Sequence, residues 1–382
     1  MRNLSRLVAV MALAATGLAA AVAPALASAH RHHVPRPGAA RRVVFVQTDN
    51  TAGNQVIAYH RRADGTLRLA GTYPTGGLGG QLDGSVVDHL ASQGSLSYDP
   101  AHGLLLAVNA GSDTVSVFSV RGDRLGLRQV IRSGGSFPVS IAVRGDLVYV
   151  LNALSGGSVQ GYRILFHQLV PLAGSNRSLG LDPSAAPQFT NTPGQLAFSP
   201  DGSQLIVTTK ANGNDIDVFG VRADGRLTAA PVVNSEPGTV PFAISFDRAG
   251  HLVIAEAGTN ALASFALSGN GSVALLSQVG TGDAATCWVA PARGLFFASN
   301  AGSAAISGYS SGPGGQLTLL GQTGTDPGTV DASATPGGRY LYVQTGGNGI
   351  VDEFAVGAAG TLTEIGSVPV PGSVGGEGIV AA

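Results

Sequence analysis

Two side chains in the sequence could transfer a proton in a hydrolytic reaction. His89 carries an imidazole that titrates near neutral pH, and Glu256 could do the same if burial raises its pKa. Opening an ester or a lactone also needs hydrogen-bond donors for the oxyanion that develops on the carbonyl oxygen. Lys210, Asn109 and Asn300 are the candidate donors. Hydrolysis of a lactone is therefore one chemistry that these residue types allow.

The acidic residues near His89 suggest a second chemistry. Asp83, Asp88 and His89 are close in the sequence and carry groups that bind divalent metals, but their spacing matches no specific ligand motif. The glycine-rich stretch 77–80 leads into neither the spacing nor the helix of a phosphate-binding loop. We therefore expect no metal and no cofactor.

A repeating unit of short strands must position these residues. In 95–125, apolar runs over 95–98 and 104–108 are followed by an alternating run from Val115 to Val120, with turns between them. Runs rich in valine, leucine and aromatics and bounded by Gly, Pro, Asn and Asp are typical of strands joined by hairpins. The second run of the unit recurs seven times, beginning at Val44, Leu105, Val148, Leu205, Leu252, Phe296 and Leu341.

The spacing of these runs predicts the architecture. Most follow one another after about 45 residues, and each unit holds four short strands, which is the signature of a β-propeller. The chain has one tryptophan and no Trp-Asp signature, which excludes a WD40 propeller. The sequence therefore predicts an all-β, seven-bladed β-propeller with four-stranded blades over residues 43–382.

The two ends of this domain complement each other. Residues 377–382 have the pattern of a first strand with nothing after it, and residues 42–48 have that of a second strand with nothing before it. Pairing the C-terminal strand with the N-terminal strands completes the seventh blade and closes the ring. Closure also removes the open edges at which a sheet could aggregate.

Propeller connectivity sorts the polar residues between the two mouths of the central channel. The loops between blades and the turns after the second strands meet at one mouth, where we place His89 and Glu256. The polar residues that we expect to bind a ligand at this mouth are Gln93, Asn109, Asn152, Gln195, Lys210, Asn300, Asp331 and Glu377. His102, His167 and His251 fall in turns of the other mouth, where we expect exposed turn residues.

Two connections between blades are longer than the repeat requires, at 74–93 and 171–193. Long ordered loops in a compact fold are often functional, but glycine-rich loops also serve as spacers. Both interpretations remain open for these two excursions.

Composition excludes several classes of partner. Charged residues make up 12% of the chain and the net charge is −1, so the basic face that a nucleic acid or an anionic membrane needs is missing. Cys287 is the only cysteine, so no intramolecular disulfide can form. We expect Cys287, beside Trp288 in an apolar strand, to be a buried core residue.

Residues 1–29 have the features of a secretory signal peptide. Arg2 and Arg6 precede an apolar run over 7–22, and small residues close the segment. A membrane anchor is the alternative, although the run is short for a bilayer span. Residues 30–42 are basic and without periodicity, which predicts a disordered tail. We therefore expect a secreted, extracellular protein with no membrane span in its mature chain.

The patterns in 96–120, 196–219 and 335–354 resemble the lactonase family of seven-bladed β-propellers, which includes 6-phosphogluconolactonase and 3-carboxymuconate cyclase types. The resemblance covers residues 43–382 and implies the same fold. Family members with these activities carry Pro-x-His and Pro-Arg-His before the first turn of a blade. The matching stretches of this chain, 93–95, 137–140 and 193–195, hold no histidine or arginine. The catalytic residues of the family therefore cannot be carried over.

Two functions remain open. One is an exported, monomeric propeller that binds a small ligand or a cell-surface partner at the channel mouth without catalysis. The alternative is an exported hydrolase or isomerase that acts on a lactone. An export signal fits poorly with a cytosolic sugar-phosphate substrate.

Overall fold

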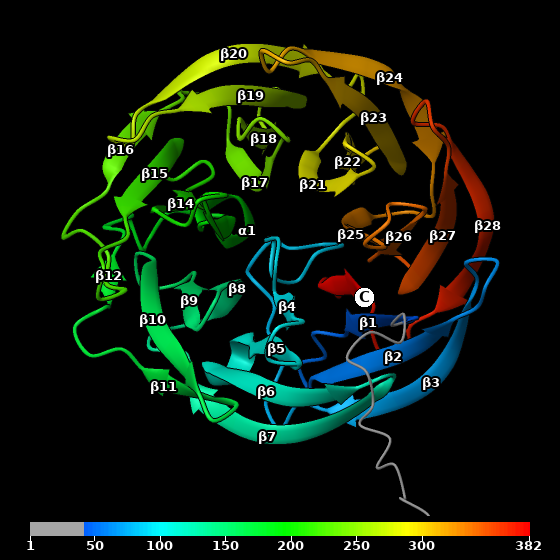
Figure 1. Cartoon of the computed structure of the whole chain (residues 1–382), viewed down its shortest axis with the longest axis horizontal. Coiled ribbons are helices and arrows are strands. Elements are labelled where there is room, and N and C mark those ends of the chain that lie inside the picture. The colour runs from blue at the N-terminus through cyan, green and yellow to red at the C-terminus, as the bar shows by residue number, and fades with distance from the viewer. Residues whose placement is uncertain (1–41) are drawn as a thin grey trace, which may run out of the picture. The chain divides into compact units, whose positions relative to one another are not determined.

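The computed structural model describes residues 42–382, which form seven antiparallel sheets. The sheets stand as blades around a central channel, with the first strand of each blade nearest the channel (Figure 1). The predicted seven-bladed β-propeller is confirmed. The predicted signal peptide and nearly all of the predicted tail lie outside the described residues. Within 42–382, the structure contains no helix with the length and hydrophobicity of a membrane span.

The strands of the first four blades follow one another from the channel outward. Blade 1 consists of β29 (Ile379–Ala381), β1 (Val43–Gln47), β2 (Gln55–Arg61) and β3 (Leu67–Pro74). Blade 2 consists of β4 (Leu96–Asp99), β5 (Leu104–Asn109), β6 (Thr114–Arg121) and β7 (Arg124–Arg132). Blade 3 consists of β8 (Pro138–Arg144), β9 (Leu147–Asn152), β10 (Ser158–Leu165) and β11 (Gln168–Pro171), with β12 (Arg177–Ser178) also on β10. Blade 4 consists of β13 (Gln195–Phe198), β14 (Gln204–Thr208), β15 (Asp215–Gly220) and β16 (Val232–Ser235).

The remaining three blades have the same order. Blade 5 consists of β17 (Pro241–Phe246), β18 (Leu252–Glu256), β19 (Ala261–Leu267) and β20 (Val273–Gly280). Blade 6 consists of β21 (Thr286–Ala292), β22 (Leu295–Asn300), β23 (Ala305–Ser311) and β24 (Leu317–Gly324). Blade 7 consists of β25 (Thr329–Ala334), β26 (Tyr340–Thr345), β27 (Ile350–Val356) and β28 (Leu362–Pro369).

Burial falls from the second strand of each blade to the outer strand. Every residue of β5, β9 and β26 is buried, whereas every residue of the outer strand β7 is partly or fully exposed. A strand that is buried on both faces needs apolar residues at nearly every position. This explains why the second strands appear in the sequence as continuous apolar runs.

The two ends of the domain pair within one blade, numbered blade 1 here, and this pairing closes the ring as predicted. Strand β29 pairs with β1 in antiparallel register, with Phe45 opposite Val380. The backbone N–H of Gln47 donates to the carbonyl of Gly378 at 2.8 Å, and that of Ala382 donates to the carbonyl of Val43 at 2.9 Å. The first strand of blade 1 thus comes from the opposite end of the domain.

Blade 3 departs from the predicted four strands. Its strand β11 pairs only with the second half of β10, and β12, from the excursion at 171–193, pairs with the first half. Two short segments therefore share the outer edge of this blade. The same excursion then forms the short helix α1 (Gln188–Asn191) before blade 4 begins.

Candidate functional site

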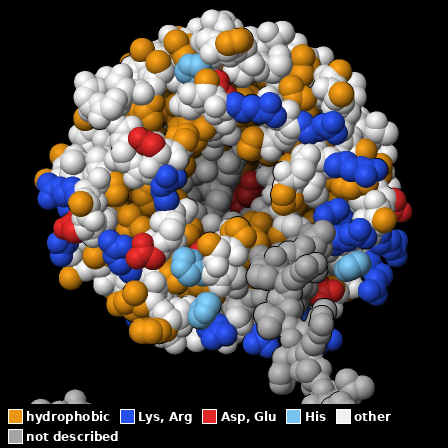
Figure 2. Space-filling view, viewed as in Figure 1, with side chains coloured by type: hydrophobic (Ala, Val, Ile, Leu, Met, Phe, Trp, Pro, Cys, Tyr) orange, Lys and Arg blue, Asp and Glu red, His pale blue; other side chains and the backbone are white. Residues whose placement is uncertain are grey.

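A cavity of about 300 Å³ opens at the mouth formed by the loops between blades. Viewed along the channel, the ring is hollow at its centre and acidic side chains line the hollow (Figure 2). The side chains and backbone that line the cavity come from both excursions and from blades 4, 5 and 6: Val86, Val87, Asp88, Phe189, Thr190, Lys210, Val240, Phe242, Ala257, Ala285, Cys287, Trp288, Ala301 and Gly302.

The two long excursions meet at this cavity. The backbone N–H of Phe189, in α1, donates to the carbonyl of Asp83 at 3.2 Å, and the N–H of Asp83 donates to the side chain of Gln188 at 3.0 Å. The first excursion contributes Asp88 to the lining and the second contributes Phe189. Each excursion therefore does more than connect two blades, because together they form part of one wall.

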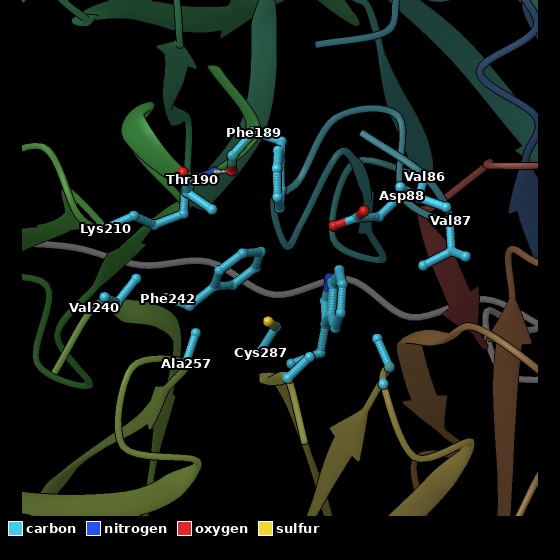
Figure 3. A pocket seen from close by; sticks show the side chains of 14 residues that line it. Val86, Val87, Asp88, Phe189, Thr190, Lys210, Val240, Phe242, Ala257 and Cys287 are labelled. Carbon is cyan, nitrogen blue, oxygen red and sulfur yellow. Dashed lines mark hydrogen bonds between the residues drawn. The ribbon is translucent and has the colours of Figure 1, made fainter. Parts of the chain in front are cut away.

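Aromatic rings form much of the apolar lining. The ring centroids of Phe242 and Trp288 are 5.1 Å apart, and the indole N–H of Trp288 donates to the carbonyl of Ser92 at 2.6 Å. Figure 3 shows the rings of Phe189 and Phe242 and the sulfur of Cys287 directed toward one open space. Cys287 packs against the core around Trp288 as expected, but it is only partly buried, because it also lines the cavity.

Lys210 holds the two excursions against blade 4. Its side chain is 1% exposed, and its ammonium donates to the carbonyl of Ala91 at 2.7 Å and to that of Phe189 at 2.6 Å. The ammonium also lies 5.1 Å from the centre of the Phe242 ring. Burial lowers the pKa of Lys210, and the carboxylates of Asp88 and Glu377 oppose that shift.

Four buried carboxyl groups surround this mouth, each with a pKa raised chiefly by burial: Asp49, Asp88, Asp331 and Glu377. Burial raises the pKa of Asp49 and of Asp331 to about 7. Glu377 is fully buried, and burial together with the charges of Asp88 and Asp49 raises its pKa well above 4.5. The backbone N–H of Ser92 donates to Glu377, and the N–H of Glu377 donates to Asp49 at 2.8 Å.

These carboxyl groups do not form a metal site. Among residues 42–382, no three His, Cys, Asp or Glu side chains converge as ligands for a metal ion. The Asp83, Asp88 and His89 segment that suggested a metal does not bring its three side chains together in this way. The site instead combines a largely apolar cavity with one lining carboxylate and one lining ammonium group.

The candidate catalytic residues do not line the cavity. The side chain of Glu256 is 1% exposed, and its carboxylate accepts hydrogen bonds from Thr259 at 2.9 Å and from Gln278 at 2.5 Å. The half-buried ring of His89 lies against Gly375, where a Cβ atom would be 2.2 Å from its Nε2. Burial raises the pKa of Glu256 and lowers that of His89. The structure therefore does not bring this acid and this imidazole into the cavity that Asp88 lines.

The three candidate asparagines brace their own blades. Each ends a second strand, is fully buried and donates to a side chain of the third strand: Asn109 to Ser116 at 2.8 Å, Asn152 to Ser158 at 3.4 Å and Asn300 to Ser307 at 2.9 Å. Glu256 occupies the same position in blade 5. None of the four lines the cavity.

The remaining predicted ligand residues lie near the channel and bind backbone groups. Gln93 exchanges two hydrogen bonds with the backbone of Val289, at 3.2 and 2.9 Å, and so connects the first excursion to blade 6. Gln195 accepts from the N–H of Ile244 at 2.5 Å and connects blade 4 to blade 5. Asp331 accepts from the adjacent backbone N–H at 2.9 Å. Of the predicted ligand-binding residues, only Lys210 lines the cavity.

The histidines of the opposite mouth differ from one another. His167 is exposed, as expected, but His102 and His251 are partly buried. The Nδ1 atom of His251 lies 2.7 Å from the carboxylate of Asp247, and His102 makes the equivalent contact with Asp99. Both histidines therefore close the turn between the first two strands of a blade.

One sequence signal for the cavity was missed. Lys210 is the only lysine in the sequence. It stands two residues after the end of β14, as Asp49 stands two residues after the end of β1 in blade 1. The other five blades have a small residue at the matching position of the repeat: Ala110, Ala153, Ala257, Ala301 and Gly346. At this position two of the seven repeats have a charged residue and the other five have alanine or glycine. This departure from the repeat indicates the mouth at which buried charged groups lie.

The fold and the cavity define a seven-bladed β-propeller with a ligand-sized space at one mouth. Its fold is that of the lactonase-type propellers. A periplasmic gluconolactonase from Pseudomonas aeruginosa matches with a TM-score of 0.69 and 20% identity, over 88% of this chain and 98% of that chain. A protein from Lactobacillus plantarum matches with a TM-score of 0.71 and 18% identity, over 88% and 98%.

The sequence comparisons add no closer relationship. No family model and no curated protein matches this sequence. At the identities of the structural matches, the likeness establishes the fold and leaves the activity to be argued from the site.

Proposed function

We propose that this protein is an exported propeller that binds a small, largely apolar molecule in the mouth cavity, without a need for catalysis. The observation that carries the proposal is the cavity itself, which is the size of a small ligand and has aromatic walls with two charged groups. Export rests on the leader-like pattern of residues 1–29.

The position of the candidate catalytic groups supports binding over hydrolysis. The carboxylate of Glu256 is already bound by Thr259 and Gln278, and the ring of His89 lies against Gly375. A general base must come within hydrogen-bond reach of the group that it deprotonates. Neither residue lines the space that a substrate would occupy.

Ligand binding can be measured with a reporter that the chain already contains. Trp288 is the only tryptophan and lines the cavity, so its fluorescence should change when the cavity fills. We expect a library of small aromatic and aliphatic compounds to yield ligands that both change this fluorescence and raise the melting temperature.

A pair of matched variants locates the site. Phe189→Ala removes a cavity wall, whereas Phe198→Ala removes a ring of similar partial burial that does not line the cavity. We expect only the first to weaken binding, by roughly tenfold or more. Undiminished binding by the folded Phe189→Ala protein would refute the proposed site.

Hydrolysis of a lactone is the second candidate function. It is favoured by the carboxylate of Asp88, which lines the cavity and whose pKa burial raises toward that of a general base. The fold match to a periplasmic gluconolactonase points the same way. A lactone panel with purified protein tests it: turnover that disappears in Asp88→Asn would establish a hydrolase. Turnover that survives in Asp88→Asn, His89→Ala and Glu256→Ala would place the reaction elsewhere.

A further inference from the structure

We propose that the molecule bound in the mouth cavity is an organic cation, with an apolar body against the aromatic walls and its positive charge on the carboxylate of Asp88. The inference rests on the proposed function, because it names the chemical class of ligand for the same cavity.

The first argument is the unmet hydrogen-bonding capacity of Asp88. This residue is 7% exposed and lines the cavity, and Figure 3 shows its carboxylate directed into the space that Phe189, Phe242 and Cys287 surround. Of residues 42–382, none other than Asp88 itself donates a hydrogen bond to this carboxylate. Burying a carboxylate that accepts a hydrogen bond only from its own backbone costs free energy. An ammonium group in the cavity would supply the partner.

The second argument is the balance of charge around Asp88. The titratable groups that face it are Lys210 from the turn after β14, Glu377 from the segment before β29 and Cys287 from β21. The one positive charge near an ionised Asp88 is the ammonium of Lys210, whose hydrogen bonds go to the carbonyls of Ala91 and Phe189. Glu377 adds a second negative charge only at a pH high enough to ionise it, because its pKa is raised. A cationic ligand gives Asp88 a direct partner, whereas an anionic ligand would add another negative charge beside it.

The third argument is the aromatic lining. The face of an aromatic ring attracts a cation, and the protein already uses this interaction, since the ammonium of Lys210 lies over Phe242. Phe189 and Trp288 offer further aromatic surface to a ligand. A metal cation is a poorer match, because the rest of the lining is largely apolar and no three His, Cys, Asp or Glu side chains among residues 42–382 are placed to hold a metal ion.

Three probes with the same body and different charge test the inference. Phenethylammonium, 2-phenylethanol and phenylacetate each carry one phenyl ring on a short chain. We expect phenethylammonium to bind roughly tenfold or more tightly than the alcohol, and phenylacetate to bind most weakly, by Trp288 fluorescence and calorimetry.

The outcomes separate this inference from the proposed function. Tighter binding of the alcohol or of phenylacetate would overturn the cationic assignment and leave ligand binding in the cavity intact. Binding by none of the three would overturn both.

Variants assign the charge to one carboxylate. Asp88→Asn keeps the shape and removes the charge, so phenethylammonium should then bind no better than 2-phenylethanol. Asp217→Asn is the matched control, because Asp217 is 4% exposed with a pKa that burial raises to about 7, and it lies outside the cavity. Unchanged ammonium binding in Asp88→Asn would contradict the role of Asp88.

The pH dependence of ligand affinity provides a further test, because it would not change if Asp88 had a purely structural role. Burial raises the pKa of Asp88 and lowers that of Lys210, so rising pH ionises the carboxyl group and then discharges the ammonium group. Both changes favour a cation. Binding of the permanently charged benzyltrimethylammonium should therefore strengthen between about pH 6 and about pH 8. Asp88→Asn should weaken this dependence, and a pH-independent affinity in the unsubstituted protein would contradict the inference.

Discussion

Carboxyl groups at the two mouths of the channel have opposite environments. Asp201, in the turn between β13 and β14, accepts hydrogen bonds from the backbone N–H of Ser203 and the hydroxyl of Ser199, which lower its pKa to about 2. Asp49 and Asp331 lie at the mouth where the cavity of the proposed ligand opens, which we call the ligand mouth; both are buried, and burial raises their pKa to about 7. The same side chain is stabilised as an anion in one region and destabilised as an anion in the other.

The difference separates two uses of acidic residues. A turn carboxylate that accepts backbone hydrogen bonds stabilises the folded state when it is ionised. Buried carboxyl groups at the ligand mouth oppose folding at neutral pH, so folding alone does not account for their presence. Groups of this kind with perturbed pKa values are characteristic of functional sites. The comparison therefore separates carboxylates that stabilise the turns from buried carboxyl groups that surround the mouth where the cavity opens.

Among the changes that test this comparison, removal of residues 377–382 should have the largest effect on the free energy of unfolding. The truncation takes away Glu377 together with β29, and so exposes the buried edge of β1. We expect it to remove most of a folding stability of about 5 to 15 kcal/mol, measured by urea unfolding. Glu377→Gln, which keeps the strand, should unfold much closer to the unsubstituted protein. A truncated chain that melts like the full chain would show that ring closure contributes nothing.

Replacing the buried ammonium group should have the next largest effect. Lys210→Met leaves the carbonyls of Ala91 and Phe189 without their donor and leaves Asp88 without its nearby positive charge. We expect a loss of about 3 kcal/mol in the free energy of unfolding. Arg163→Met, which breaks an exposed ion pair with Asp146, should cost less than about 1 kcal/mol. Equal losses of unfolding free energy in the two variants would contradict the difference between the buried and the exposed charged groups.

The pH dependence of stability should have opposite slopes for the two sets of carboxyl groups. The Asp331 carboxyl keeps its proton to about pH 7 when folded but loses it near 3.8 when unfolded, so its contribution to stability falls as pH rises across that interval. The contribution of Asp201 is full above about 3.8 and is lost as pH falls toward about 2.

Unfolding free energies measured across this pH range provide the test. Asp331→Asn should flatten the curve between about pH 4 and about pH 7, and Asp201→Asn should change it only at more acidic pH. A flat curve for the unsubstituted protein from about pH 4 to about pH 7 would argue against raised pKa values at the ligand mouth.

Neutralising Glu256 should have the smallest effect. In Glu256→Gln the side-chain carbonyl can still accept from Thr259, and a buried charge disappears. We expect a change of less than about 1 kcal/mol in the free energy of unfolding and no change in ligand affinity. Glu256→Ala should cost about 2 kcal/mol, because the donors of Thr259 and Gln278 lose their acceptor. Weaker ligand binding by Glu256→Gln would instead extend the site to this residue.

The sequence was sufficient to predict the blades because their burial has a period. The buried second strands appeared as apolar runs, and the pairing of 379–381 with 44–46 followed from one missing strand at each end. The strand β12 and the helix α1 left no periodic signal, because two and four residues are too short to show a period.

The site was harder to predict, because the spacing of the repeats gives the position of a residue at a strand end but not the direction of its side chain. Asn109 and Asn300 end second strands as expected, but their side chains point into the blade and bind Ser116 and Ser307. The contact between Phe189 and Asp83 joins loops about 100 residues apart that share no repeat. Such contacts form only in the folded ring, so a sequence pattern within one repeat cannot predict them.

The closing strand also constrains how the protein is made. Because residues 44–46 pair with 379–381, blade 1 lacks its channel-side strand until residue 381 has been synthesised. Contacts between such distant residues make folding slow, since a long loop must close before the contact forms. The ring, and with it Glu377 at the ligand mouth, is therefore completed only after translation has passed the last blade.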